Sequence, residues 1–148
     1  MNLAKKPLSF LMIAFMSLSG CASVKVKPAG SELGLQHVCI EDNPKVAFEG
    51  LEDIISKGFA RHNITTELYT EGKVPEECRF ILNYTARRSW DIVPYMSYAR
   101  LELKENGETV AEATYTLIIH WIFIKFKSVE AKMNPVIDKL LANYEKNT

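Results

Sequence analysis

The three cysteines have the most specific chemistry in this chain. A thiol can be acylated, can be oxidised to a disulfide, or can bind a metal ion as a thiolate. Cys21 follows an apolar segment and the small residues Ser19 and Gly20, whereas Cys39 and Cys78 lie far from any such segment. The three thiols are therefore expected to serve two different purposes.

The residues before Cys21 have the three zones of a secretory signal. Lys5 and Lys6 supply a short positive region, and an apolar stretch runs from Leu8 to Ser19. This stretch is shorter than the roughly 20 residues of a membrane-spanning helix, but it fits the apolar region of a signal peptide. The alternative is an uncleaved signal in which Cys21 has no role. We expect residues 1–20 to be a signal peptide.

The sequence Leu18-Ser19-Gly20-Cys21 resembles the lipobox of bacterial lipoproteins. This resemblance implies that Cys21 becomes the new N-terminus and carries a diacylglycerol and an N-acyl chain such as palmitate. Ala22 stands where an inner-membrane retention signal usually has Asp, which implies a lipid anchor in the outer membrane, facing the periplasm. The membrane is then the first expected partner, and no other cofactor is expected.

In an oxidising periplasm, Cys39 and Cys78 are an even pair of thiols, which favours a disulfide. The bond would close a loop of about 39 residues and stabilise the fold by roughly 3–4 kcal/mol in the chain-entropy model. Two free buried thiols or a pair of metal ligands are the alternatives. Because His37 is the one further ligand at suitable spacing, we expect the disulfide and no metal site.

Two further regions could bind a partner. In the first, Arg87, Arg88 and Trp90 precede Tyr98 and Arg100; on adjoining strands they would suit carboxylates, phosphates or glycans, unless they are only a solvated sheet face. The second is an apolar run over residues 117–126. It would be a strand buried on both faces, or a loop in which Trp121 and Phe123 touch a partner or the bilayer.

Catalysis and nucleic-acid binding are not indicated. The sequence contains no nucleophile elbow, zinc-protease motif, phosphate-binding glycine loop or calcium loop, and His37, His62 and His120 fall on three different expected elements. The chain has 18 basic and 18 acidic residues, and removal of Lys5 and Lys6 leaves 16 basic against 18 acidic. A nucleic-acid protein would show clustered excess base. We expect no enzymatic activity and no nucleic acid as a partner.

The elements that position these residues predict an α+β domain. Residues 22–35, with Pro28, Gly30 and Gly34, indicate a flexible tether, and residues 36–148 indicate a single domain. We expect strands at 36–41, 64–69 and 80–90 and on both sides of Asn106-Gly107, one helix over 46–61 and one at the C-terminal end. They fit one mixed or antiparallel sheet of about five strands, in the order β-α-β-β-β-β-α, with two helices on one face.

Three details of these elements can be checked. Asp42-Asn43-Pro44 is expected to start the first helix, in which Gly50 and Gly58 would mark a close approach to the sheet. The last helix would begin at Asn134-Pro135, or near Ser128 with Pro135 inside it. For the final hairpin, burial of apolar side chains predicts Leu101 opposite Ala113 and Leu103 opposite Ala111, reached by a three-residue loop over 106–108.

The layout resembles the periplasmic α/β domain at the N-terminus of TolB and in the curli secretion lipoprotein. The matching pieces are Val38–Glu41, Val46–Arg61 and Leu101–Val110 around Asn106-Gly107. The terminal segment Pro135–Leu141 resembles that of small Gram-negative lipoproteins, which implies a fold and a location but no activity.

Three functions are then weighed. The leading hypothesis is a membrane-anchored, non-catalytic binding or assembly module that acts on a protein of the cell envelope. The second is a lipid- or small-ligand-binding protein with a cavity lined by Phe48, Phe59 and Tyr115. The third is a hydrolase, which would require a His beside a Ser or a carboxylate in a cleft.

Overall fold

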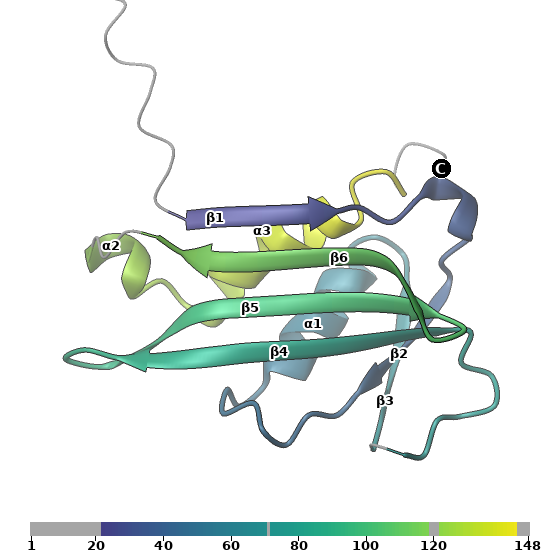
Figure 1. The fold of residues 1–148 in the computed structure, drawn as a ribbon, viewed down its shortest axis with the longest axis horizontal. Helices are drawn as coiled ribbons and strands as arrows, with labels where there is room; N and C mark the ends of the chain where they lie inside the picture. Colours follow the sequence, from purple (N-terminus) through teal and green to yellow (C-terminus); the bar gives the residue numbers. More distant parts are fainter. Residues whose placement is uncertain (1–21, 71, 119–121, 145–148) are drawn as a thin grey trace, which may run out of the picture.

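One mixed sheet of six strands organises the chain (Figure 1). The computed structural model describes residues 22–70, 72–118 and 122–144. The strands are β1 (Ala22–Lys27), β2 (His37–Glu41), β3 (Thr65–Tyr69), β4 (Phe80–Trp90), β5 (Pro94–Glu105) and β6 (Glu108–Leu117). They lie in the order β1-β6-β5-β4-β2-β3, in which β2 is parallel to both of its neighbours and the other pairs are antiparallel. The predicted α+β class is confirmed, with one strand more than expected.

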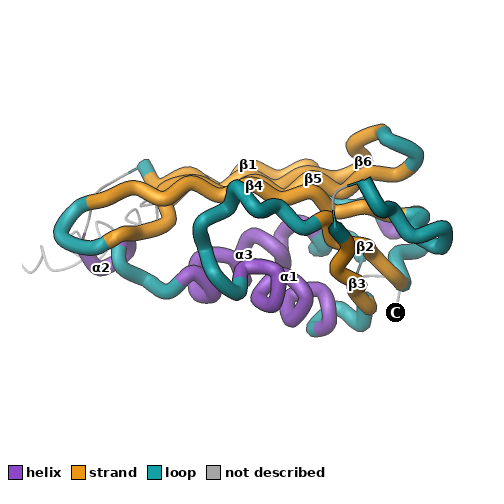
Figure 2. Tube along the Cα trace, turned by 90° about the horizontal axis from the view of Figure 1, so that it is seen from below, coloured by secondary structure: helices purple, strands orange, loops and turns teal. Residues whose placement is uncertain are grey.

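The helices are α1 (Leu51–Ala60), α2 (Ile122–Lys125) and α3 (Val129–Leu140), and a short 3-10 turn spans Ser31–Leu33. Both longer helices, α1 and α3, cover the same face of the sheet, as predicted (Figure 2). Alternate residues of the long strands, such as Leu82, Leu101 and Ala113, face these helices and are fully buried. The opposite face carries the polar residues of the same strands and is left uncovered by α1 and α3.

The β5–β6 hairpin has the predicted pairing but a different turn. Leu101 lies opposite Ala113 and Leu103 opposite Ala111, which confirms the register. The loop consists of Asn106 and Gly107 alone, both with positive φ (51° and 83°), and Glu105 pairs with Glu108. A β-bulge beyond the turn, between Leu103 and Lys104, absorbs the extra residue. Burial therefore selected the register, while the Asn-Gly pair kept its preferred two-residue turn.

The predicted tether is wrong, because residues 22–27 form strand β1. Ala22 pairs with Leu117 and Lys27 with Glu112, so β1 extends the sheet beside β6. Val24 and Val26 alternate with Lys25 and Lys27, which is the period of a strand with one buried face. Beyond the strand, Ala29 and Leu35 are fully buried, and the Ala29 amide donates to the carbonyl of Leu140 (2.7 Å). Residues 22–35 are therefore part of the folded domain.

Helix α1 begins later than predicted, and its Gly58 marks a close approach to another helix and not to the sheet. The Asn43 side chain is occupied elsewhere, since its amide donates to the Tyr84 carbonyl (2.9 Å) and its oxygen accepts from the Lys45 amide (3.1 Å). Gly50, in the left-handed conformation (φ 76°), precedes the first turn of α1. A Cβ atom built on Gly58 would lie 2.4 Å from Cδ1 of Ile137, so this glycine allows α1 to pack closely against α3.

Helix α3 begins at the earlier of the two predicted positions. Ser128 caps it, because its hydroxyl oxygen accepts from the Ala131 amide (3.1 Å), and Pro135 lies inside the helix. Because α3 begins at Val129, Lys132 lies within its first turns and is buried in the protein interior.

Candidate functional site

Three parts of the chain meet at one end of the sheet (Figure 1). The first residue of β1 pairs with the last residue of β6, and α2 follows β6 directly. The β4–β5 hairpin turns at the same end, because Trp90 pairs with Pro94 and Tyr98 pairs with Thr116 near the end of β6. We call this the hairpin end and define its surface by Trp90, Ile92, Val93, Ile118 and Phe126.

The hairpin end is unusually apolar for an exposed surface. Seven large apolar side chains are exposed among the described residues, and the five that define the hairpin end are among them. Trp90 is 75% exposed and Ile92 is 87% exposed. A concentration of this kind at one end differs from the scattered single residues of an ordinary surface, and it is typical of a surface that contacts a partner or a membrane.

The hairpin end is also held in place by buried charges. Lys125 of α2 is buried, pairs with Asp91 in the β4–β5 turn, and has its Nζ 4.7 Å from the centre of the Tyr95 ring. The Tyr95 ring in turn packs edge to face against Phe126, with 6.2 Å between ring centres. These contacts join the turn to the segment after β6, so the exposed apolar side chains sit on a structured base.

Lys132 of α3 adds two hydrogen bonds to these contacts. Its Nζ donates to the carbonyl oxygens of Met96 (3.0 Å) and Lys125 (2.7 Å), and the residue is 5% exposed. Burial lowers the pKa of Lys132 to about 8, because the protonated amine is poorly solvated there.

The predicted arginine and aromatic residues do not form a single surface. Arg87 stacks over Tyr98 (4.9 Å) on the uncovered face of the sheet, and Arg88 reaches towards the loop before α1, where it stacks over Phe48 (5.1 Å) and donates to the Ala47 carbonyl. Trp90 belongs to the hairpin end. Arg100 lies between Glu102 (3.0 Å) and Glu112 (2.8 Å), whose carboxylates already satisfy its charge. Arg87, Tyr98 and Arg100 therefore share the uncovered face, whereas Arg88 and Trp90 lie apart from it, and anion binding by this face stays a prediction.

The apolar run over residues 117–126 is not one buried strand. Strand β6 ends at Leu117, Ile118 is exposed, and α2 occupies residues 122–125. Cys21 and Trp121 lie outside the described residues, and so does the side chain of Phe123. The sequence predicted Trp90 but missed Ile92 and Val93, although a turn that reads Trp-Asp-Ile-Val-Pro is more apolar than a solvated turn should be.

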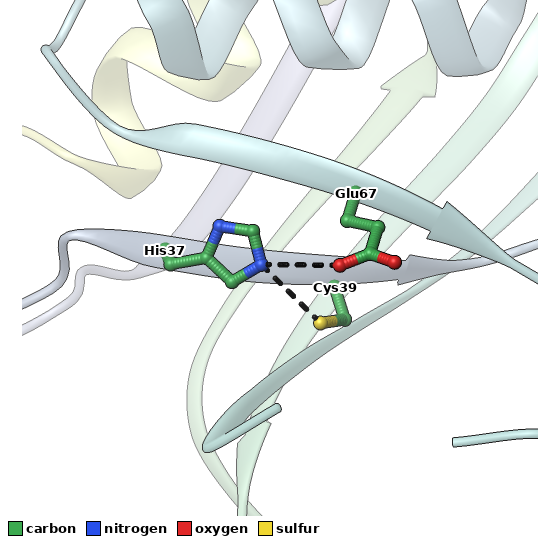
Figure 3. A group of neighbouring side chains, drawn as sticks. All are labelled: His37, Cys39 and Glu67. Carbon is green, nitrogen blue, oxygen red and sulfur yellow. Dashed lines mark hydrogen bonds and ion pairs between the residues drawn. The ribbon is translucent and has the colours of Figure 1, made fainter. Parts of the chain in front are cut away.

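A second group of side chains lies on the uncovered face near the other edge of the sheet. The predicted disulfide joins Cys39 of β2 to Cys78, with 5.8 Å between their Cα atoms. His37 Nε2 lies 3.7 Å from Cys39 Sγ and 3.7 Å from an oxygen of Glu67, and the three side chains point toward one another (Figure 3). While Cys39 is in a disulfide it offers no thiolate, so His37 and Glu67 are the available metal ligands of this trio.

A surface pocket of about 370 Å³ lies between the β2–α1 loop and β4. Its lining includes Glu41, Asn43, Lys45 and Asn83. Tyr84 also lines it, and the Tyr84 hydroxyl donates to Glu52 and accepts from the Asn43 amide (3.1 Å). Burial, together with this bond to Glu52, raises the pKa of Tyr84. Most of the residues that line the pocket are polar, and it lies apart from the predicted cavity, since Phe59 and Tyr115 are buried in the core.

The remaining described histidine, His62, ties two helices together. Its Nε2 lies 3.0 Å from Asp138, which also accepts from Arg61 (2.8 Å), so the end of α1 is joined to α3. Burial opposes ionisation of Asp138, but the bonds from His62 and Arg61 outweigh it and lower the pKa of Asp138. We assign this group a role in packing the helices.

Comparison with family models found no match, and comparison with curated proteins found none either. Solved structures do resemble the chain. The fold is similar to that of PelC. A PelC L103M dodecamer from Paraburkholderia phytofirmans is 15% identical, with a TM-score of 0.55, and the match covers 86% of this chain and 99% of that one. A PelC dodecamer from the same organism is 17% identical, with a TM-score of 0.55 and coverage of 82% and 97%.

The likeness to PelC concerns the fold alone, because the identity is low. It extends over 99% of the PelC chain. The resemblance to the TolB and curli domains remains a prediction. Within the described residues, no helix has the length and hydropathy to cross a membrane.

Proposed function

We propose that the chain is a lipid-anchored, non-catalytic binding or assembly module of the cell envelope, held on the periplasmic side of the outer membrane with its hairpin end against the lipid. The observation that carries this proposal is the position of the exposed apolar side chains. They lie at the end of the sheet where β1 begins, one residue after Cys21.

This position supports a domain that lies directly on the membrane. A residue of extended chain spans about 3.3 Å, so a lipidated Cys21 without a tether would hold the start of β1 within a few ångströms of the lipid headgroups. Trp90 would then meet the interface that tryptophan prefers, and Ile92 and Val93 could leave water for the acyl region. The anchor and the hairpin end would act as two membrane contacts, which bind more firmly than one.

A second copy of the chain is the first protein partner to test. PelC is a dodecamer in the solved structures that share this fold. Among the described residues, the outer strands β1 and β3 each pair with one strand, so each leaves a row of backbone groups on its other side. Chemical crosslinking in intact envelopes, followed by mass spectrometry, should recover copies of the chain or a defined envelope protein. Recovery of abundant porins alone would count against an assembly role.

The membrane anchor is tested by labelling. We expect radiolabelled palmitate to be incorporated into the full chain and to be lost in Cys21→Ser, with the wild-type protein in the outer-membrane fraction. Cys39→Ser combined with Cys78→Ser is the matched control, and it should retain the label. Labelling that persists in Cys21→Ser would overturn the anchor.

Binding of a small ligand is the second candidate, and the polar pocket between the β2–α1 loop and β4 favours it. A small polar molecule fits this lining better than a lipid does. Native mass spectrometry of protein purified from its own host should reveal a retained mass if this function is correct, whereas an apo mass would argue against it.

A further inference from the structure

The group formed by His37, Cys39 and Glu67 has the composition and spacing of a metal site, and the disulfide places Cys78 beside Cys39. His37 and Cys39 lie two residues apart on β2 and therefore share a face, and Glu67 of β3 is the register partner of Cys39. The available ligand atoms of His37, Cys39 and Glu67 all lie within 4.8 Å of one another (Figure 3). Two ligands bound at 2.0–2.3 Å to one tetrahedral zinc ion are roughly 3.3–3.8 Å apart. The two distances of 3.7 Å from His37 Nε2 fall in this range.

A hydrogen bond at Nδ1 of His37 determines which of the two ring nitrogens carries the lone pair. The Thr65 hydroxyl donates its one proton to the Gln36 carbonyl (3.0 Å), so its oxygen must accept from Nδ1–H of His37 (2.9 Å). In the neutral ring, Nε2 then carries a lone pair, and that lone pair faces a carboxylate and a sulfur atom. Only a proton or a cation at this point makes the arrangement attractive. Metal-binding histidines usually have such a hydrogen bond on their second nitrogen.

The disulfide decides how many ligands the group can offer. In the oxidised protein, the sulfur atoms of Cys39 and Cys78 are bonded to each other and carry no charge. Reduction by a dithiol transfers two electrons and two protons to this bond, which yields two protein thiols and a disulfide on the reductant. Cys39 is buried, but Cys78 is partly exposed, so a reductant can attack the Cys78 side. The Cα separation of 5.8 Å leaves both sulfur atoms within reach of a single ion.

We infer that reduction of Cys39–Cys78 creates a tetrahedral Zn²⁺ site formed by both cysteines, His37 and Glu67. Binding of Zn²⁺ releases the two thiol protons, and reoxidation of the thiolates by a disulfide oxidant releases the ion. Two thiolates, an imidazole and a carboxylate are ligands that zinc accepts in four-coordinate sites. The site lies at the β2–β3 edge of the sheet, and it does not depend on the lipid anchor.

The test is a metal titration of the full chain, purified in detergent and reduced with a phosphine. We expect one Zn²⁺ per reduced chain, and Co²⁺ in its place should give thiolate-to-cobalt charge-transfer absorption. His37→Asn and Glu67→Gln should each weaken Zn²⁺ binding at least tenfold, whereas Glu49→Gln, an exposed carboxylate in the loop before α1, should not. A thiol assay verifies the starting state: two free thiols in a reduced, lipidated chain and three if Cys21 is unmodified.

Three results would overturn the inference. The reduced chain could bind no Zn²⁺, the oxidised chain could bind it equally well, or both single variants could retain wild-type affinity. The last result would mean that the two thiols chelate the ion without His37 and Glu67. Both of these side chains are partly exposed, so the variants should fold, and the circular dichroism of their oxidised forms checks this.

Discussion

Lys132 shows how a single buried amine can support the hairpin end. Its two hydrogen bonds hold the end of α2 and the start of β5. The unfolded chain keeps the Lys132 proton up to its ordinary pKa of 10.5, whereas the folded protein releases it from about pH 8. The unfolded state therefore binds more protons between these values, and the contribution of Lys132 to the free energy of unfolding rises with pH in this window.

This behaviour predicts a pH-dependent difference between the wild type and Lys132→Met. The methionine fills similar space but cannot titrate, so the wild type should gain stability relative to the variant as the pH rises from 7 to 10. Urea unfolding at intervals of one pH unit measures the difference. The tyrosines titrate in both proteins and so cancel. A difference that stays constant across this range would contradict the assignment.

At the same scale, the sequence predicted pairs that depend on chemistry alone and missed those that depend on register. Two cysteines, in a compartment that the sequence led us to expect to be oxidising, were enough to predict the disulfide that the structure contains. Glu67 lies beside Cys39 because β2 and β3 pair in parallel. No local sequence pattern predicts that pairing. Similarly, the sequence suggested that Arg100 could bind an external anion, but the strand register places it between two glutamates.

At the scale of elements, the packing of α1 against α3 gives a sharp test. Replacing Gly58 by Ala would favour the helix by about 1 kcal/mol in isolation. In the protein, however, the new methyl group would lie 2.4 Å from Cδ1 and 3.1 Å from Cγ2 of Ile137. We therefore expect Gly58→Ala to destabilise the fold by about 1–3 kcal/mol.

The matched control removes the methyl group that clashes. In an Ile137→Val background, which lacks Cδ1, the cost of Gly58→Ala should fall by about 1 kcal/mol. Chemical denaturation of the wild type, both single variants and the double variant closes this cycle. A stabilising Gly58→Ala in the wild-type background would show that the two helices are further apart than described.

Helices and strands were predicted correctly where the hydrophobic pattern extended over many residues. They were missed or misplaced where a few neighbouring residues favoured two different structures. The alternation over residues 80–90 predicted β4 with its observed limits. Strand β1 was missed because its six residues stand next to Pro28 and Gly30, whose composition suggested a loop. The start of α1 was misplaced because Asn43 can cap a turn as well as a helix, and its bond to Tyr84, distant in sequence, decided between them.

At the scale of the whole molecule, strand β1 in place of a flexible tether changes what the proposed lipid anchor would do. A flexible tether would let the domain tumble away from the membrane, whereas a strand that begins at residue 22 would fix one end of the sheet to it. The exposed apolar side chains gather at that same end. Trp90 is therefore expected to lie in the headgroup region of the bilayer when the protein is anchored.

The most direct measurement uses the fluorescence of Trp90 in proteoliposomes made from the full, lipidated chain. Trp121→Phe leaves Trp90 as the one tryptophan, since the chain has two. We predict that the Trp90 emission is blue-shifted. Lipids brominated near the headgroup end of their acyl chains should quench it strongly, and lipids brominated near the bilayer centre should quench it less. Acrylamide should quench it only weakly. Emission that is unchanged by every brominated lipid and freely quenched by acrylamide would contradict a hairpin end that lies on the membrane.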